Sequence, residues 1–244
     1  MKALILAAGF GMRLQPLTQK TPKALLQIGD LTLLERAVFY LRKNGIKEIA
    51  VNAYYLAGQV IDFLNSRKDL KIKKIFFERE LLDTGGAIKN AQNFLKDSKP
   101  FVVFNVDILT NINLLPALEF KNSSSALATL LVSNRTTSRP FLVTKNGQLV
   151  GHFDKKNNLK RVATKNFTGA LKEVGFLGIH LVSPKIFSLM PEENKFSSVD
   201  LYLDLVAQGE LINVFEANDC YWQDIGTIKR LQQARLDWQK LKIF

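Results

Sequence analysis

The first half of the chain alternates short apolar runs with segments whose apolar residues recur at helical spacing. Strands that alternate with helices in this way are typical of a parallel sheet covered by helices on both faces. The pattern therefore predicts an α/β fold with a doubly wound, mostly parallel central sheet. The predicted strands lie at about 2–7, 47–52, 72–77 and 100–106, and the predicted helices at about 32–44, 56–66 and 84–97.

From about residue 124 the pattern changes to β-rich segments. Asn146-Gly147 separates two apolar runs, and Asn-Gly is a strong hairpin signal. The absence of a repeat or a Pro/Ser-rich linker favours a single domain, 1–244, in which 124–244 forms a wall of one cleft with 1–123. Beyond the hairpin we expect a strand near 173–182 and helices opened by Ser183-Pro184, at about 198–208, and from Gly226-Thr227 to the C-terminus.

The loop after the first strand has the chemistry of a phosphate-binding loop. Gly9 and Gly11 allow a tight turn whose amides approach an anion, and Arg13 and Lys23 add positive charge. The third glycine of a dinucleotide-binding loop is missing, since Leu14 stands there, and no G-x-x-x-x-G-K-[ST] occurs. A dinucleotide dehydrogenase and a P-loop ATPase are therefore disfavoured.

Composition narrows the chemistry further. Cys220 is the only cysteine and His152 and His180 are the only histidines, which excludes an intramolecular disulfide and disfavours a zinc site. Any metal is expected to be a hard cation held by carboxylates and phosphates, for which Mg²⁺ is the natural candidate. No apolar run reaches the roughly 18 residues of a membrane span, and no secretory leader pattern is present. We therefore expect a cytoplasmic protein without a membrane partner.

The formal charge of +12 attracts polyanions. Much of it lies in two clusters, 67–74 and 155–165. No nucleic-acid-binding motif accompanies them, so a solvated face is favoured over a nucleic-acid footprint, and no nucleic-acid partner is expected. Small phosphorylated substrates would benefit from the same positive field.

Two aspartates are candidate metal ligands. Asp107 directly follows the strand at 100–106, and ligands of open α/β sheets bind beyond the carboxyl ends of the strands. The competing interpretation is a cap for the turn that follows. Asp224 precedes the last helix, where simple N-terminal capping is the plainer interpretation. Spacing alone does not show whether the two carboxylates meet.

Two further segments follow strands. Thr84, Gly85 and Gly86 open a helix, and the glycines would let a flat ring lie against the backbone; an N-cap with a flexible first turn is the alternative. Asn52 follows the second strand and belongs either to the site or to a packing segment.

Together these segments resemble the sugar-1-phosphate nucleotidyltransferase (NDP-sugar pyrophosphorylase) family. The resemblance covers nearly the whole chain and looks closest to the N-acetylmuramate-1-phosphate uridylyltransferase and mannose-1-phosphate guanylyltransferase branches. It implies a Rossmann-like nucleotidyltransferase fold. It also implies transfer of a nucleoside monophosphate from an NTP to a sugar 1-phosphate with Mg²⁺, giving pyrophosphate and an NDP-sugar for cell-envelope polysaccharide. The segments that carry it are 6–18, 21–25, 84–88, 105–107 and 224–227.

The resemblance also implies roles for individual residues. Arg13 and Lys23 would act on the phosphates during transfer, Asp107 and Asp224 would hold Mg²⁺, and two further groups would bind the substrates. The nucleotide-binding group is Leu6, Ala8, Gly9, Gly11, Met12, Asn52, Thr84, Gly85 and Gly86, and the sugar-binding group is Asn105, Arg139 and Gly178.

The chain departs from the family pattern at three points. Val106 stands where glycine usually precedes the first metal aspartate, and Met12 stands where Ser, Thr or Glu is common. The Glu-Lys-Pro segment that grips the sugar phosphate in larger members is absent, and Ser138-Arg139 or Lys172-Glu173 are the candidate substitutes.

Several questions stay open at this stage: the base, the sugar, and whether the chain is a monomer or a homodimer. Two alternative functions also stay open. One is cytidylyl transfer to phosphocholine or a similar phosphorylated alcohol, which an aromatic pocket would favour. The other is a non-catalytic, nucleotide-sugar-binding regulatory protein.

Overall fold

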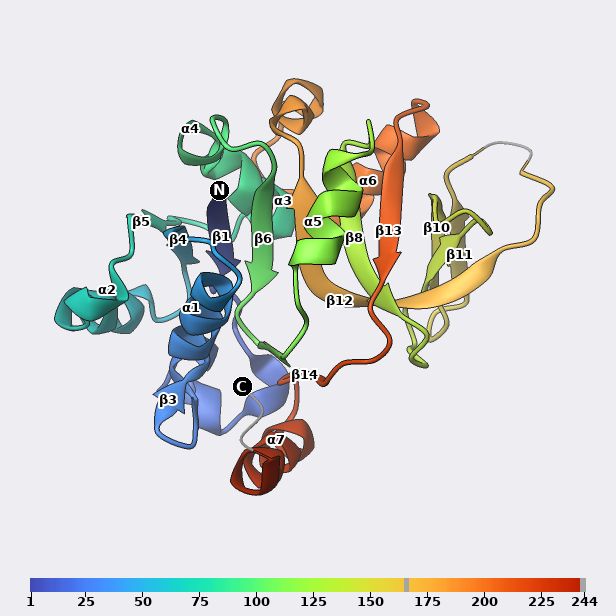
Figure 1. Cartoon of the computed structure of the whole chain (residues 1–244). Coiled ribbons are helices and arrows are strands. Elements are labelled where there is room, and N and C mark those ends of the chain that lie inside the picture. The colour runs from blue at the N-terminus through green and yellow to red at the C-terminus, as the bar shows by residue number, and fades with distance from the viewer. Residues whose placement is uncertain (165–166, 242–244) are drawn as a thin grey trace.

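A ten-stranded sheet forms the centre of the computed structural model, which describes residues 1–164 and 167–241 (Figure 1). Four parallel strands make up one half of this sheet and confirm the predicted α/β layout. In spatial order they are β5 (Lys74–Phe77), β4 (Glu48–Ala53), β1 (Lys2–Leu6) and β6 (Phe101–Asn105).

The other half of the sheet is mainly antiparallel and is organised by the long strand β12 (Lys172–Val182), which lies beside β6. The carboxyl-terminal part of β12 pairs with β6, its amino-terminal part pairs with β9, and β8 lies along both parts. The predicted hairpin is confirmed, because β9 and β10 pair around Gly147. The strands are β8 (Ala128–Ser133), β9 (Phe141–Val143), β10 (Leu149–Asp154), β11 (Leu159–Val162) and β13 (Ile212–Glu216).

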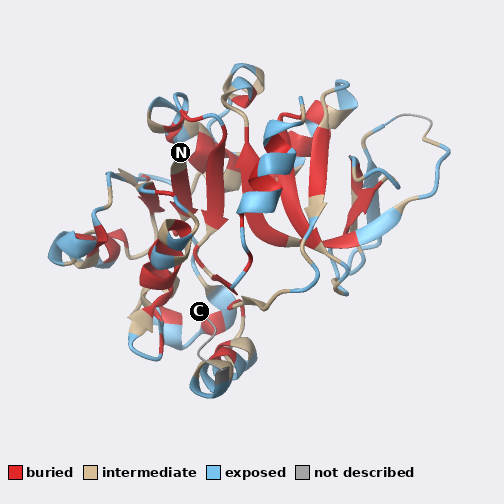
Figure 2. Cartoon of the chain, viewed as in Figure 1, coloured by how far each residue is buried: buried red, intermediate tan, exposed pale blue. Residues whose placement is uncertain are grey.

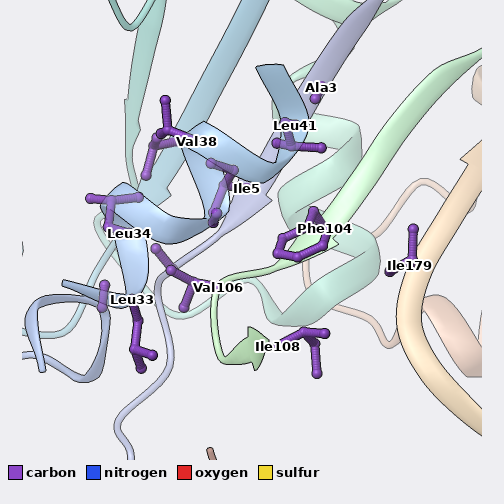
Figure 3. Packing of buried hydrophobic residues seen from close by; sticks show 14 of the residues in the cluster. Ala3, Ile5, Leu33, Leu34, Val38, Leu41, Phe104, Val106, Ile108 and Ile179 are labelled. Carbon is purple, nitrogen blue, oxygen red and sulfur yellow. The ribbon is translucent and has the colours of Figure 1, made fainter. Parts of the chain in front are cut away.

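Helices cover both faces of the sheet, because alternate residues of its buried strands point to opposite sides. Ile5 and Phe104 belong to the core beneath α1, shown in Figure 3, whereas Leu4 and Val103 belong to the core of the opposite face. The central strands β1, β4, β6 and β8 are correspondingly almost entirely buried, whereas the edge strands β5 and β11 are partly or fully exposed (Figure 2). The first face carries α1 (Leu33–Lys43), α2 (Ala57–Ser66), α5 (Leu115–Asn122) and α7 (Ile228–Leu241), and the second carries α3 (Asp83–Asn90), α4 (Gln92–Leu95) and α6 (Ser198–Ala207).

Local chemistry fixes where α1 begins and ends. Thr32 and Glu35 form a capping box, in which the Thr32 amide donates to Glu35 Oε2 at 2.7 Å and the Glu35 amide donates to Thr32 Oγ1 at 3.1 Å. Gly45, with φ +80°, follows the last turn and takes the left-handed conformation that glycine tolerates best. These caps fix the bounds of α1 at Leu33–Lys43.

Some elements differ from the prediction. The helix expected at 84–97 is divided into α3 and α4, and the segment after Ser183 is a 3-10 helix, Pro184–Leu189, rather than an α-helix. The short elements β2 (Gln27–Ile28), β3 (Leu31–Thr32), β7 (Ile108–Thr110), β14 (Trp222–Asp224) and α5 were not predicted. Lys165, from the second basic cluster, and the last three residues of the predicted C-terminal helix lie outside the described residues.

The last helix packs on the domain it follows. Leu231 and Ala234 are buried, and the Arg36 guanidinium lies over the Trp238 ring at 4.0 Å. Among residues 1–164 and 167–241, no helix has the length and apolar character needed to cross a bilayer.

Candidate active site

Three parallel strands end at the same level, and their loops meet there. Leu6, the last residue of β1, lies in register with Asn52 of β4 and with Asn105 of β6. This is the carboxyl edge of the sheet, where β6 points downward in Figure 1, and it is the edge at which ligands were expected. A hollow of about 260 Å³ opens there, lined by Leu6, Ala7, Ala8, Gly9, Lys23, Asn52, Leu81, Asp83, Thr84, Asn105, Val106 and Asp107.

Gly9 and Gly11 of the first loop are glycines for different structural reasons. Gly11 has φ +64°, and a Cβ there would lie 2.9 Å from Thr18 Cγ2, so glycine is needed for the turn itself. The turn is closed by a hydrogen bond of 2.9 Å from Thr18 Oγ1 to the Gly11 carbonyl. At Gly9 a Cβ would have no neighbour within 4 Å, so the backbone is open to a ligand at that point.

Asn52 holds this loop through a buried chain of hydrogen bonds. Its Oδ1 accepts from the Ala7 amide at 2.7 Å, and its Nδ2 donates to Glu78 Oε1 at 2.7 Å. Glu78 Oε2 in turn accepts from the Leu82 amide at 3.2 Å, and burial raises the pKa of the Glu78 carboxyl. The Asn52 amide is therefore committed to positioning the loops, a packing role that the sequence left open.

Lys23 and Asp107 form an ion pair at the floor of the hollow. Their side chains are only 15% and 20% exposed, so water screens this pair much less than a surface pair. Lys23 reaches it from the short helical turn Lys23–Leu25, and Asp107 from the end of β6. A lysine and a carboxylate are thus held together where the loop amides converge.

The two predicted metal aspartates lie side by side. β14 pairs antiparallel with β7, which sets Asp224 opposite Ile108, and the Ile225 amide donates to the Asp107 carbonyl at 2.9 Å. Neither short strand was predicted, and together they bring the C-terminal segment to the end of β6.

Asp224 also approaches Arg13. Its Oδ2 accepts from Arg230 Nη1 at 2.7 Å, whereas its Oδ1 is buried without a partner. A Cβ on Gly226 would lie 2.6 Å from Asp224 Oδ1 and 2.8 Å from Arg13 Nη2, so only glycine lets these groups come this close. Within the described chain Arg13 forms no ion pair, which leaves its guanidinium available to an anion.

The donor set fits a magnesium ion. Asp107 and Asp224 are neighbours, and the unpartnered Asp224 Oδ1 has a ligand position unfilled by protein. The described residues contain no group of three or more His, Cys, Asp or Glu side chains placed to hold a metal. Two carboxylates with the remaining positions left to water and phosphate are what Mg²⁺ commonly takes, and they do not suit zinc.

A second, larger cleft of about 580 Å³ adjoins the hollow and shares Asn105 and Asp107 with it. Most of its walls come from the second half of the chain. Its other lining residues are Ile108, Arg135, Thr137, Arg139, Phe141, His152, Asp154, Leu159, Arg161, Phe176, Gly178, Ser197, Val199, Asp200, Trp222 and Asp224.

Gly178 lies in this cleft at an irregularity of β12. The pairing with β8 shifts between Phe176 and His180, and Gly178 there has φ +76°. A Cβ would lie 2.9 Å from Ile108 Cγ1 and 3.0 Å from Asn105 Nδ2. The Oδ1 of Asn105 is buried without a partner and could accept a hydrogen bond from a hydroxyl. All three predicted sugar-side residues, Asn105, Arg139 and Gly178, line the cleft.

Arg135 is a cleft residue that the sequence analysis missed. Its guanidinium lies over the Trp222 ring at 4.3 Å, Nη2 donates to the Phe176 carbonyl at 2.7 Å, and Nε is buried without a partner. Burial lowers the pKa of Arg135, although Asp224 opposes this. The only signal was a polar run, 133–139, directly after an apolar strand.

The structure separates the two candidates for the missing sugar-phosphate segment. Arg139 lines the cleft and pairs with Asp154 at 3.2 Å. Lys172 instead pairs with Glu216 and Glu173 with Lys155, and neither Lys172 nor Glu173 lines the cleft. Lys172-Glu173 is therefore ruled out as the substitute by its position.

Gly85 and Gly86 are explained by packing. A Cβ on Gly85 would lie 2.4 Å from Phe196 Cδ2, and one on Gly86 would lie 2.0 Å from the Asn194 carbonyl oxygen. Thr84 lines the hollow and accepts a hydrogen bond of 2.9 Å from the Ser198 amide, whereas the two glycines do not line it. Their predicted contact with a base stays a prediction.

The structure shows where two positions that depart from the family pattern lie. Val106 is 5% exposed and belongs to the core shown in Figure 3, so its side chain is accommodated by packing against residues such as Ile5 and Leu34. Met12 is 63% exposed and lines neither the hollow nor the cleft.

A glycine loop, a lysine–aspartate pair and two adjacent carboxylates at the carboxyl edge of a parallel sheet define a phosphate-binding α/β protein of the nucleotide-binding type. Residues 2–240 match the model of the Nucleotidyl transferase family. The chain belongs to that family.

Named relatives agree with this membership. The chain is 28% identical over 232 residues to a mannose-1-phosphate guanyltransferase of Yarrowia lipolytica, covering 94% of this chain and 61% of the relative. It is 28% identical over 231 residues to the bifunctional protein GlmU of Methanococcus maripaludis, covering 93% and 51%. The chain thus spans about half to three fifths of the length of these relatives.

A solved structure confirms the fold over nearly the whole chain. It is a putative glucose-1-phosphate thymidylyltransferase from Bacillus anthracis, with a TM-score of 0.77 at 23% identity, covering 97% of this chain and 94% of that one.

Proposed function

We propose that this protein transfers a nucleoside monophosphate from an NTP to a sugar 1-phosphate, releasing pyrophosphate and forming an NDP-sugar. The observation that carries the proposal is the junction of the two cavities at Asn105 and Asp107. One cavity has loop amides and Lys23 for a triphosphate, and the other has arginines and an unpartnered amide oxygen for a phosphorylated sugar. In this proposal residues 1–123 hold the nucleotide and residues 124–244 hold the acceptor.

The reaction is an in-line displacement at phosphorus. An oxygen of the sugar 1-phosphate forms a bond to the α-phosphorus, the bond from the α-phosphorus to the bridging oxygen breaks, and pyrophosphate leaves with that electron pair. A phosphate monoester is mostly dianionic near pH 7, since its second pKa is about 6, so no strong general base is required. The task of the protein is to align two polyanions and neutralise the charge that moves to pyrophosphate.

Different residues of the chain carry out separate parts of this task. In this proposal the open backbone at Gly9 admits the phosphates, and the Arg13 guanidinium, which has no ion pair in the described chain, would bind them. Lys23 stabilises the charge at the transferred group, and Asn52 keeps the loop in place through the Ala7 amide. Asp107 and Asp224 would hold Mg²⁺. When bound, Mg²⁺ supplies neutralisation of the triphosphate charge.

The acceptor side favours a sugar phosphate over phosphocholine. An aromatic cage for a quaternary ammonium needs an open ring face, and in the cleft the Trp222 face is covered by the Arg135 guanidinium. Of the arginines in this cleft, Arg135 has no ion pair in the described chain and is available to the phosphate of an acceptor. A purely regulatory role is disfavoured because Lys23 and Asp107 are paired in the hollow and Asp224 lines the adjoining cleft together with Asp107.

The substrates are tested by pyrophosphate release with Mg²⁺. GTP, UTP, CTP and dTTP are each paired with mannose, glucose, N-acetylmuramate and heptose 1-phosphates and with phosphocholine. GTP with mannose 1-phosphate comes first, because the Yarrowia lipolytica relative bears that name. Release with a sugar 1-phosphate supports the proposal, whereas release with phosphocholine alone supports the alternative transfer. Tight binding of an NDP-sugar without any release would point to the regulatory protein.

The cellular setting is part of the same proposal. NTPs are cytoplasmic, so the enzyme would act there, and the NDP-sugar would feed cell-envelope polysaccharide synthesis. Substrates are small molecules, and no nucleic acid or membrane partner is proposed. Monomer and homodimer both remain open.

A further inference from the structure

A second basic hollow lies at the opposite end of the sheet from the active site. It occupies about 290 Å³, where β6 begins, β12 ends and α5 ends. In Figure 1 this is the upper end of β6, whereas the Asp107 end is below. Its lining residues are Lys99, Pro100, Lys121, Asn122, Ser124, Ser183, Pro184 and Lys185.

Lys121 is the unusual member of this group. It is 6% exposed, and within the described chain its ammonium has no hydrogen bond or ion pair. Burial and the like charge of Lys185 both lower the pKa of Lys121. Most of the side chain is buried, whereas its ammonium still reaches solvent, so it can meet an anion that enters the hollow.

The end of α5 does not provide that partner. A lysine in a last helical turn often compensates the free carbonyls of the helix. Here the Glu119 carbonyl accepts from the Ser123 amide at 3.0 Å, the Phe120 carbonyl from Ser123 Oγ at 3.0 Å, and the Lys121 carbonyl from the Ser124 amide at 3.3 Å. These carbonyls are satisfied without the ammonium.

The rest of the hollow favours an anion. No carboxylate is among its lining residues in the described chain, and Lys99 and Lys185 are exposed lysines without an ion pair there. Ser124 Oγ accepts from the Ala126 amide at 3.1 Å and from Asn213 Nδ2 at 2.9 Å, which leaves its O–H proton to donate. Three ammonium groups and a hydroxyl suit a compact, doubly charged anion.

We propose that this hollow binds the phosphate group of a small molecule, with Lys99, Lys121 and Lys185 as its cationic ligands. The small volume and the concave shape select a metabolite-sized phosphate rather than a nucleic-acid backbone. Pro100 in this hollow directly precedes β6, whose last residue Asn105 lies in the active site, so the two sites lie at opposite ends of one buried strand.

The test measures orthophosphate binding to the full chain by titration calorimetry, in a Lys23→Met background that weakens phosphate binding in the active site. We expect saturable binding to persist in that background and to weaken at least tenfold on adding Lys121→Met. Lys185→Ser, at an exposed position that leaves the fold unchanged, should weaken it several-fold. The matched control is Lys145→Met, an exposed lysine in the hairpin turn between β9 and β10.

Three results would overturn the proposal. They are unchanged binding in Lys121→Met and Lys185→Ser, equal weakening in Lys145→Met, and loss of all binding in Lys23→Met alone. Equal weakening by the control would show general attraction to the +12 net charge. Because binding is read directly, the outcome does not depend on the proposed transferase activity.

Discussion

Asp224 is set beside Asp107 by backbone pairing, since the Ile225 amide donates to the Asp107 carbonyl at 2.9 Å. The contact uses main-chain atoms, so a change of either side chain leaves the pairing of β7 with β14 in place. This relationship ties the last strand of the chain to the end of β6, and it permits substitutions that alter charge without moving the site.

Asp107→Asn should remove most turnover while the fold persists, because it deletes the charge of a proposed metal ligand and almost no volume. Turnover at saturating Mg²⁺ and thermal unfolding are measured together. Asp62→Asn, an exposed carboxylate on α2 without an ion pair in the described chain, is the matched control and should retain full turnover. Turnover near that of the wild type in Asp107→Asn would refute its role in holding the metal.

Lys23→Ala should lower kcat by about 10²–10³-fold, equivalent to about 3–4 kcal/mol of transition-state stabilisation, as for loss of one preorganised electrostatic donor. Steady-state kinetics separate kcat from KM. Lys20→Ala removes an exposed lysine from the same loop and should change neither. A rise in KM at constant kcat would instead make Lys23 a ground-state binding residue.

Gly178→Ala should destabilise the protein by about 1–3 kcal/mol, because alanine is strained at φ +76° and its Cβ would lie 2.9 Å from Ile108 Cγ1. The free energy of unfolding in urea measures this. Gly58→Ala is the contrasting variant, since Gly58 lies inside α2 with no atom within 4 Å of an added Cβ, and it should stabilise by about 0.5–1 kcal/mol. Equal changes in the free energy of unfolding for Gly178→Ala and Gly58→Ala would contradict the destabilisation expected from the conformation and contacts of Gly178.

His180 should make stability depend on pH. It is buried, its Nδ1 lies 2.8 Å from the Tyr202 hydroxyl, and burial lowers its pKa to about 3. Between about pH 6.5 and 3 the unfolded chain binds a proton at this residue and the folded chain does not, so stability falls as pH falls. From pH 7 to 5 this single residue should contribute a loss of about 2 kcal/mol.

The measurement compares urea unfolding of the wild type and of His180→Gln at pH 7, 6 and 5. Between pH 7 and 5 the variant should lose less stability than the wild type, by about 2 kcal/mol. His152, whose pKa is lowered by burial and by Arg139, is present in both proteins and cancels. Parallel pH profiles would mean that His180 does not remain neutral in the folded state.

The parallel half of the fold and its ligand edge were predictable because their signals are local. Buried parallel strands such as 101–105 are mostly apolar runs, and their last residues mark the carboxyl edge of the sheet. Leu6, Asn52 and Asn105 each end such a run, and parallel pairing necessarily sets them at one level.

The residues that were missed depend on long-range pairing. β7 and β14 have three residues each, which is too short to show the alternation of apolar and polar residues typical of a strand. They form strands because they pair with each other. Arg135 is held in the cleft by the Phe176 carbonyl of β12 and the Trp222 ring of β14, long-range contacts that no local pattern encodes. The packing of Gly85 and Gly86 against Asn194 and Phe196 was also out of reach, because that segment lies far along the chain.

The central claim is that the α-phosphorus of the NTP moves to the sugar phosphate. The most direct measurement follows the label from an NTP labelled at the α-phosphorus, incubated with Mg²⁺ and the sugar 1-phosphate that the pyrophosphate screen selects. The account predicts that the label appears in an NDP-sugar in equal amount to released pyrophosphate, and that Asp107→Asn abolishes both. Recovery of the label only as free NTP or NMP, with no labelled NDP-sugar, would contradict it.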